Sequence, residues 1–445
     1  MNKYFIFSFL LFVSLLANAQ NKWTLDDCIQ QAIKENLELK QSTFDNKIKK
    51  EDLRQSRMAL LPTLNGYLSV DNSYGRSIDP SNNEIVSTQL LQTGISASSS
   101  LTLFQGFVNI NRVQYNRLTV LKGSLNEEIL KNDIIFKVMN AFFDFCFSKG
   151  QLQIALDQFE MSTMNLNKIR VMVDAGIKAG TDVAEIESRL AQDDFKVTQA
   201  RNNVYKSKLA LQQLLNNTTD ITFDINNEII DGIYELEKMP DPDSVFNLAE
   251  QHLPQFGEII VDSKISTTNL AIARGGRMPV LRAQAGYGTG YYDSYKDQNG
   301  SLIGFHDQLG NNGYQYVGLS LSIPLFNGWQ VNRSINNARW NVEKTNAGNE
   351  IKIRNFRFEI ENACLALKSA ADEYRSSIVQ KKASDINLQL AEKKWEQGIG
   401  NLLELTDARN RKASAEAEML RTQLQYQLKF KTIQIFTGEV NFNQF

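Results

Sequence analysis

The chain has 445 residues, with 48 lysines and arginines against 50 aspartates and glutamates, for a formal net charge of −2. This balance argues against a nucleic-acid partner, which a strongly basic surface would favour. Only seven prolines occur in the whole length. That composition suits long, half-buried helices better than several small globular cores.

The N-terminus has the pattern of a secretory signal peptide. Lys3 supplies the positive charge, residues 4–16 are almost entirely apolar, and Ala17-Asn18-Ala19 is a small-x-small cleavage site. We therefore expect residues 1–19 to be removed on export. The apolar run is too short for the alternative, a retained membrane anchor, and no later window approaches 18 consecutive apolar residues.

An internal repeat relates the two halves of the chain. The segment Leu-Phe-Gln-Gly-Phe at 103–107 recurs as Leu-Phe-Asn-Gly-Trp at 325–329, 222 residues later. The same offset carries Gly176-Ile177 onto Gly398-Ile399. Agreement between separate anchors predicts two structural repeats, over residues 20–230 and 231–445.

Each half contains two segments in which apolar and polar residues alternate, the period of a strand with one apolar face. Polar loops are expected between the two strands of each pair. Strands of this length can cross a bilayer when tilted, although a pair of soluble hairpins would show the same alternation. The expected strands are residues 62–76 and 91–105, then 279–292 and 314–327, with loops at 77–89 and 288–313.

Four strands cannot close a barrel, and lipid tolerates no open sheet edge. If these strands span a membrane, copies of the chain must pool them. The rest of each half predicts helices, because apolar residues recur at three- and four-residue spacing. The long hairpins are expected at 106–215 and 329–436, led by helices at 25–60 and 244–274, with a linker at 216–243 packed around their middle. A helix of sixty-odd residues spans about 100 Å.

No catalytic or metal-binding motif is present in the sequence, and we expect neither an enzyme nor a cofactor. The two histidines, His252 and His306, lie in different contexts with no partner cluster. Cys28, Cys146 and Cys364 are an odd set without CxxC spacing. Buried free thiols are the favoured interpretation, and one disulfide is the alternative.

The turns that close the two long hairpins carry a family resemblance. They read DAGIKAGTDV at 174–183 and WEQGIGNLLELTDA at 395–408. Together with the two strand-to-helix junctions and the duplication, they resemble the outer-membrane efflux protein (TolC) family. The resemblance implies a mainly helical protomer and a homotrimer whose strands form a twelve-stranded β-barrel in outer-membrane lipid. Its function would be the exit duct of a tripartite efflux or type I secretion system, extending from the outer membrane into the periplasm.

The resemblance also implies partners. A periplasmic adaptor (membrane fusion) protein would dock at the hairpin tips and join the duct to an inner-membrane pump or ABC transporter. The tip glycines also have a local explanation, since each hairpin must reverse within a few residues. The expected adaptor-contacting residues are Gly176, Ile177, Gly180, Thr181, Asp182, Gly398, Ile399, Gly400 and Leu402.

By resemblance, Glu404 and Asp407 fall where family members place acids around the periplasmic entrance. Residues three apart share a helix face, so a trimer would stack two rings of carboxylates that favour cations. The alternative is that both acids merely suit the first turns of a helix. Asp182 matches an acid that in some members locks the tunnel with a tyrosine and an arginine. Trp395 and Gly400 stand at those positions here, so the lock is not carried over.

A periplasmic coiled-coil adaptor or scaffold is the alternative function. Adaptors also carry long helical hairpins, but usually one in each chain, whereas this sequence predicts two hairpins and two strand pairs. A porin that works without a transporter fits less well with long rods that end in an acidic mouth. The sequence does not identify the cargo.

Overall fold

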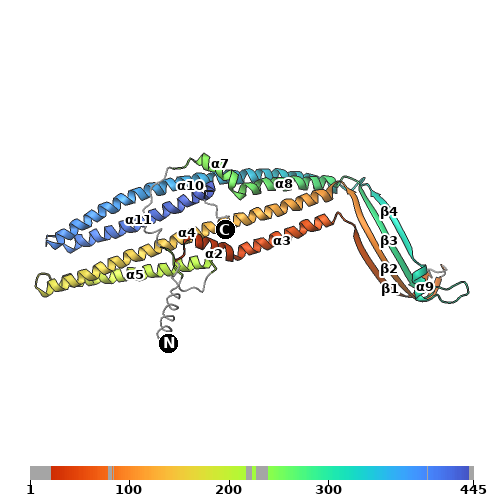
Figure 1. Ribbon diagram of the computed structural model, residues 1–445, viewed down its shortest axis with the longest axis horizontal. Coiled ribbons are helices and arrows are strands. Elements are labelled where there is room, and N and C mark those ends of the chain that lie inside the picture. The colour runs from red at the N-terminus through yellow and green to blue at the C-terminus, as the bar shows by residue number, and fades with distance from the viewer. Residues whose placement is uncertain are drawn as a thin grey trace, which may run out of the picture. The chain divides into compact units, whose positions relative to one another are not determined.

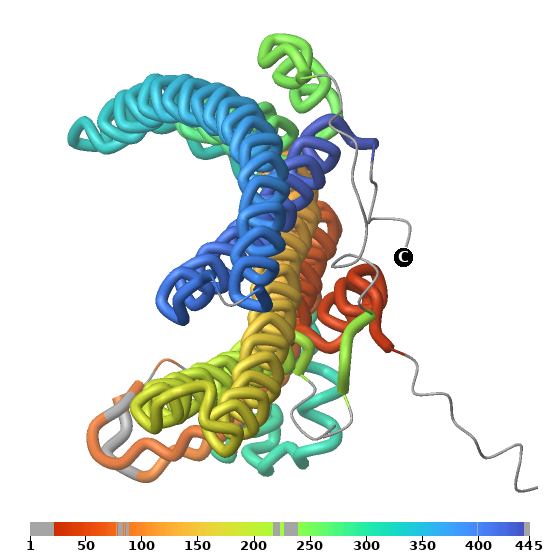
Figure 2. Tube along the Cα trace, turned by 90° about the vertical axis from the view of Figure 1, so that its left-hand side faces the viewer, coloured from red at the N-terminus to blue at the C-terminus, as the bar shows by residue number. Residues whose placement is uncertain are grey.

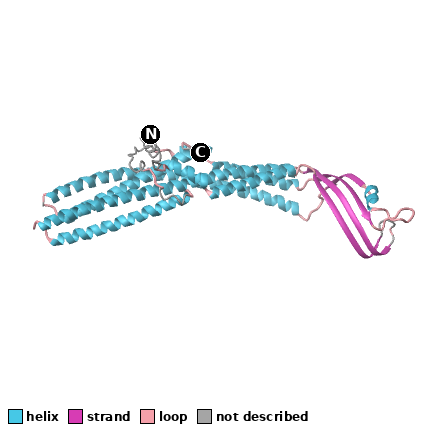
Figure 3. Cartoon of the chain, turned by 60° about the horizontal axis from the view of Figure 1, so that its bottom comes forward, coloured by secondary structure: helices cyan, strands magenta, loops and turns pink. Residues whose placement is uncertain are grey.

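The computed structural model describes residues 22–78, 83, 85–216, 223–226, 239–397 and 399–439. The expected signal peptide and Gly398 lie outside these residues. Within them the chain forms long helices and one four-stranded antiparallel sheet (Figure 1 and Figure 3). The expected fold class, mainly helical with a small β component, is confirmed.

The chain divides into two compact units, each built from separate stretches of sequence. The helical unit comprises Met1–Ser42, Asn126–Phe256 and Ile353–Phe445, and the sheet unit comprises Thr43–Leu125 and Gly257–Lys352. Four helices contribute residues to both units, and the longest two are α4 (Val108–Asp174) and α10 (Gln330–Glu396). Each has 67 residues, which corresponds to a length of about 100 Å.

The helical unit contains two antiparallel hairpins. The C-terminal part of α4 pairs with α5 (Gly180–Leu214), and α10 pairs with α11 (Leu402–Thr437). Figure 2 shows the first pair in yellow and yellow-green and the second pair in blue. A core of apolar side chains from α2 (Leu25–Glu35), α4, α5 and α11 holds the unit together. Its members include Ile29, Val138, Phe142, Phe145, Leu211, Leu424 and Ile435, together with Phe223 and Ile225 from the described part of the linker.

The helices that lead into each strand pair are broken where a single helix was expected. The first is α2 followed by α3 (Leu37–Met58); between them Asn36 is extended and its side-chain oxygen accepts a 2.9 Å hydrogen bond from the Leu39 N–H. The second is α7 (Pro242–His252) followed by α8 (Pro254–Gly275). Leu253 is extended because a residue before proline avoids the helical conformation.

The four expected strands are present with different bounds. They are β1 (Thr63–Ile78), β2 (Ile85–Gln105), β3 (Val280–Tyr292) and β4 (Tyr314–Ser322), in the order β1-β2-β3-β4. The β1–β2 hairpin continues up to the pair Ile78–Ile85, so most of the described part of the predicted loop 77–89 is strand. Strand β4 ends before Pro324, which has no N–H to donate to a ladder.

The register places the alternation of all four strands in phase. Along one row, for example, Leu68 pairs with Ile95 and Ile95 pairs with Thr289. The sheet therefore has two distinct faces. The apolar face carries Leu64, Leu68, Val70, Ile95, Ala97, Leu101, Ala283, Ala285, Tyr287, Val317, Leu319 and Leu321. The polar face carries Asn65, Asp71, Ser96, Ser98, Ser100, Thr102, Arg282, Gln284 and Ser320.

Both strand-to-helix junctions use the same unusual backbone. Gly106 and Phe107 have φ of 56° and 61°, and Gly328 and Trp329 have φ of 59° and 68°. Positive φ at an aromatic residue is uncommon, so its recurrence at equivalent motif positions is a structural sign of the repeat. A Cβ on Gly106 would lie 2.5 Å from the Gly275 carbonyl oxygen, which excludes any side chain there.

None of the helices among the described residues is both long and apolar enough to cross a membrane.

The three cysteines are buried and free, as the sequence indicated. Burial raises the pKa of the Cys28 and Cys146 thiols to about 12, and it also raises the pKa of Cys364. Because the thiolate is the nucleophile, these groups are unreactive at neutral pH.

We therefore expect a thiol-specific reagent to leave the native protein unlabelled at pH 8 and to label all three cysteines after denaturation. Mass spectrometry before and after urea treatment measures this. Rapid labelling of Cys28 or Cys146 without denaturant would contradict the burial of the α2–α4 core.

Candidate functional site: the two hairpin tips

The first tip reverses the chain between α4 and α5 through a glycine turn. The Ile177 N–H donates to the Met172 carbonyl and the Gly176 N–H donates to the Val173 carbonyl, both at 2.9 Å. Gly176 has φ of 75°, a left-handed conformation that glycine adopts without steric cost. The helix end is thus closed by the backbone, and the side chain of Ile177 remains exposed.

The second tip joins α10 to α11 by a similar wrap. The N–H groups of Ile399 and Gly400 both donate to the Lys394 carbonyl, at 3.1 and 3.0 Å. A Cβ on Gly400 would lie 3.0 Å from the Trp395 nitrogen, which explains a glycine at this close approach. The side-chain oxygen of Asn401 accepts a hydrogen bond from the Glu404 N–H at 2.6 Å and caps α11.

Beneath the tips, all four long helices share an apolar cluster that we call the tip core. Its buried members are Leu166, Ile169, Ile186, Leu388, Ala391, Trp395, Leu402, Leu405 and Ala408. Leu402 is therefore part of the packing between the hairpins. Ile177 and Ile399, in contrast, are 68% and 75% exposed and form the apolar surface of the two turns. Gly180 and Thr181 are exposed beside them, and Asp182 is half-buried in the first turn of α5.

One polar contact links the two tips directly. The Lys178 ammonium lies 4.5 Å from the centre of the Trp395 ring, within the range of a cation–π interaction. Lys178 belongs to the first tip segment identified in the sequence, but its contact with Trp395 was not expected. No local pattern could have found it, because its partner lies more than 200 residues away.

The two acids expected at the entrance are each paired with a cation of the same protomer. Glu404 contacts Lys394 at 2.6 Å, and Asp407 contacts Arg411 at 2.8 Å. All four side chains are substantially exposed, so solvent screens both pairs. The carboxylates are thus present at the second tip and on its exposed surface, with part of their charge balanced locally.

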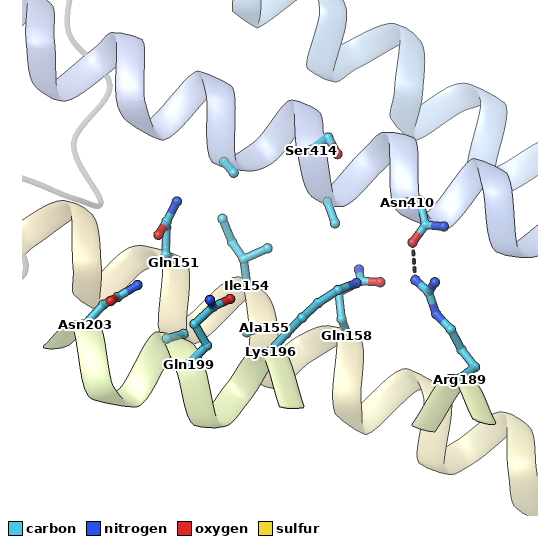
Figure 4. A pocket seen from close by; sticks show the side chains of 13 residues that line it. Gln151, Ile154, Ala155, Gln158, Arg189, Lys196, Gln199, Asn203, Asn410 and Ser414 are labelled. Carbon is cyan, nitrogen blue, oxygen red and sulfur yellow. Dashed lines mark hydrogen bonds between the residues drawn. The ribbon is translucent and has the colours of Figure 1, made fainter. Parts of the chain in front are cut away.

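Above the tip core, a polar groove of about 480 Å³ opens between α4, α5 and α11. Figure 4 shows amide side chains, among them Gln151, Gln158 and Gln199, facing across it towards Ser414 on α11. Arg189 crosses the groove and donates a hydrogen bond to Asn410. This bond connects the first hairpin to the second.

A buried carboxylate positions the cations of this groove. The Asp193 side chain is only 1% exposed and accepts from the Ser162 hydroxyl at 2.7 Å. It also contacts Arg189 and Lys196, each at 3.2 Å. The spacing of Arg189 and Asp193, four residues apart on one helix face, was the available sequence signal. Its importance depends on burial, which the sequence alone did not reveal.

One protein-family model matches this chain over most of its length. The family model described as outer membrane efflux protein matches the chain twice, over residues 28–217 and 245–439. These two matches together cover most of the chain, and each falls within one of the expected repeats.

Individual relatives agree. The outer membrane protein TolC of Salmonella enteritidis is 24% identical over 442 residues, covering 96% of this chain and 84% of that protein. TolC of Escherichia coli K12 is 23% identical over 443 residues with the same coverage. Among solved structures, the CmeC outer membrane channel of Campylobacter jejuni superposes with a TM-score of 0.78 at 14% identity, covering 94% of this chain and 88% of that one. The last likeness shows a shared fold.

We expect Asp193→Ala to destabilise the protein by about 3 to 5 kcal/mol, because removing one partner leaves Arg189 without its buried counter-charge. The neighbouring Asp194 is exposed, so Asp194→Ala is the matched control and should change stability by about 0.5 kcal/mol or less. Urea unfolding in detergent, followed by circular dichroism, measures both. Equal losses of unfolding free energy in the two variants would mean that the buried contacts of Asp193 do not stabilise the protein.

Proposed function

The chain belongs to the outer membrane efflux protein family, and on that premise we propose that three copies assemble into the trimeric exit duct of an efflux or type I secretion system. The protein is an outer-membrane channel that extends into the periplasm. The observation that carries the assembly is the sheet, which has one exposed apolar face and two unpaired edges. The alternative, an adaptor or scaffold, finds no support in the comparisons.

The sheet edges support the trimer. Within the described part of the chain, strands β1 and β4 each pair on one side only, and their outer edges carry backbone groups that lipid cannot satisfy. On β4 the apolar Val317 and Leu319 are 89% and 71% exposed. Pairing β1 of one copy with β4 of the next would close these edges. Three sheets of four strands give twelve, within the even-numbered range of outer-membrane barrels.

With the sheet closed in this way, the apolar face turns to outer-membrane lipid and the polar face lines the passage. Serine, threonine and glutamine side chains on the polar face would leave the lumen hydrated. The two halves of the chain are internal repeats on this proposal, each contributing two strands and one long hairpin. The double family match and the repeated junction geometry support this.

The tips are the proposed docking site for a periplasmic adaptor (membrane fusion) protein, which connects the duct to an inner-membrane pump or ABC transporter. Ile177 and Ile399 offer exposed apolar contacts on turns whose backbones are fixed by internal hydrogen bonds. Such a surface is small and has a fixed shape, and its two exposed isoleucines would supply the apolar contacts to an adaptor. Gly398, expected in the same surface, lies outside the described residues.

The entrance is proposed to carry the two acid rings, formed by Glu404 and Asp407 from three protomers. Their pairing with Lys394 and Arg411 lowers the net negative charge of each ring. We propose that the Lys178–Trp395 contact holds the two tips of each protomer together in the narrow state. It stands where the tyrosine-based lock of some relatives was sought, with different chemistry.

To test the docking site, we would place a photo-crosslinking amino acid at Ile177 or Ile399 in native membranes and identify adducts by mass spectrometry. Adducts with an adaptor protein are expected at both positions. Tyr205, which is equally exposed but lies farther along α5, is the control and should give markedly fewer. Adducts confined to copies of the channel itself would contradict docking at the tips.

To test the tip contact, Lys178→Gln removes the cation and leaves the tip core unchanged. A cation–π contact contributes about 0.5 to 1 kcal/mol at an exposed site. The substitution removes one such contact from each of the three protomers, so the open population of the trimer should rise by about tenfold or more. Single-channel conductance in planar bilayers measures it. Lys168→Gln, at an exposed position of α4, should leave gating unchanged. If both variants have the same open probability, the Lys178–Trp395 contact does not stabilise the narrow state.

The acid rings predict sensitivity to multivalent cations. Glu404→Gln combined with Asp407→Asn should abolish block by such a cation applied from the entrance side, because the carboxylates supply the attraction. Titrating the block in the same bilayers gives the change in affinity. Block of undiminished affinity would mean that both acids only stabilise the start of α11.

A further inference from the structure

The segment between β3 and β4 is folded, although a polar loop was expected at 288–313. Strand β3 continues to Tyr292, and α9 (Phe305–Asn311) forms within the segment. We call residues 293–313 the β3–β4 cap; Figure 1 shows α9 beside the ends of the strands. Gln308, 1% exposed, fixes the cap to the sheet. Its side-chain nitrogen donates to the carbonyls of Tyr292 and Ile303 at 2.8 Å, and its oxygen accepts from the Tyr292 N–H at 2.9 Å.

Two side-chain contacts show on which face of the sheet the cap lies. The Thr289 hydroxyl donates to the Leu309 carbonyl at 2.7 Å, and the Tyr291 ring meets the Phe305 ring edge-to-face at 5.1 Å. Thr289 and Tyr291 alternate in phase with Ala283 and Ala285, so they belong to the apolar face. The cap therefore lies on the face proposed to meet lipid, not on the face that lines the passage.

The height of the cap matches the edge of a membrane. The paired part of the apolar face begins at Leu281–Leu321 and reaches Tyr291 ten residues along β3, and the exposed Ile323 and Leu325 follow beyond the end of β4. Ten residues rise about 33 Å along a strand, and a tilt of about 40° reduces this to about 25 Å. That equals the apolar band of an outer-membrane barrel. The cap thus sits where hydrocarbon gives way to headgroups, at the end of β3 away from its preceding helix.

The outer surface of the cap has the mixed chemistry of such a boundary. Leu302 and Phe305 are 64% and 50% exposed, and the polar His306 and Asp307 are exposed next to them. On its inner side the cap is hydrogen-bonded to the end of β3: the Gln308 amide donates to the Tyr292 carbonyl and the Asn312 amide donates to the Gly290 carbonyl, both at 2.8 Å. The cap is thus held to the sheet by hydrogen bonds and still exposes a leucine and a phenylalanine beside polar side chains. This combination fits the interface between lipid and water.

We propose that the β3–β4 cap is an interfacial anchor that lies in the headgroup layer of the outer leaflet, with Leu302 and Phe305 inserted among the first acyl carbons. The partner is a lipid surface. The inference rests on the proposed membrane barrel and adds to it an element that fixes the depth of each protomer.

Depth-dependent quenching tests this with the assembled trimer in lipid vesicles. Bimane would be attached to Leu302→Cys, Val317→Cys or Gln284→Cys, since the buried native cysteines are unreactive. Phosphatidylcholine vesicles would carry a nitroxide either at the headgroup or deep in the acyl chain. We expect the Leu302 probe to be quenched several-fold more by the headgroup nitroxide, the Val317 probe more by the deep one, and the Gln284 probe, on the polar face, by neither.

The three probes separate the two levels of the proposal. If the Val317 probe is quenched by the deep nitroxide and the Leu302 probe by neither, the anchor is wrong and the barrel stands. If the Val317 probe is not quenched either, the membrane barrel itself fails.

Discussion

The hydrogen-bonding needs of the sheet edges govern the rest of this protein. A four-stranded sheet with an apolar face can enter lipid only if no backbone N–H or C=O remains unpaired there. The chain cannot meet that condition alone, because β1 and β4 each have one free side. The proposed closure between three copies would meet it. A second requirement concerns side chains: the apolar and polar rows keep one phase across all strands, and a slip of one residue in any strand would exchange its two faces.

In the helical unit, the corresponding structural requirement is to hold the two hairpin tips in a fixed shape. The tips must be rigid enough to hold a shape without a large globular core. Glycine turns such as that at Gly176 satisfy helix-end carbonyls with backbone N–H groups, and the tip core joins four helices by burying side chains such as Trp395 and Leu402. This division leaves Ile177 and Ile399 outside the packing and free for contact with a partner.

Helices and strands with a periodic apolar pattern could be predicted from the sequence, whereas contacts between residues far apart in the chain could not. Alternation and three-to-four spacing located all four strands and both hairpins, and the repeated motifs located the tips. The end of the β1–β2 hairpin beyond Arg76 was missed because its pairing depends on the backbone and not on an apolar face. The break at Leu253 follows from Pro254, a local signal that the single expected range 244–274 did not take into account. The Lys178–Trp395 contact and the α9 cap arise from tertiary packing, which no window of sequence contains.

The equal length of α4 and α10 constrains how such a chain can change over generations. Each helix runs for 67 residues between a junction with two left-handed residues and a hairpin tip. Adding a residue to one rod alone would shift its tip by about 1.5 Å and rotate everything beyond the insertion by about 100°. The tip core would then lose its partners. Tolerated insertions in one rod should therefore be matched in the other, so that the duct grows or shrinks in paired steps.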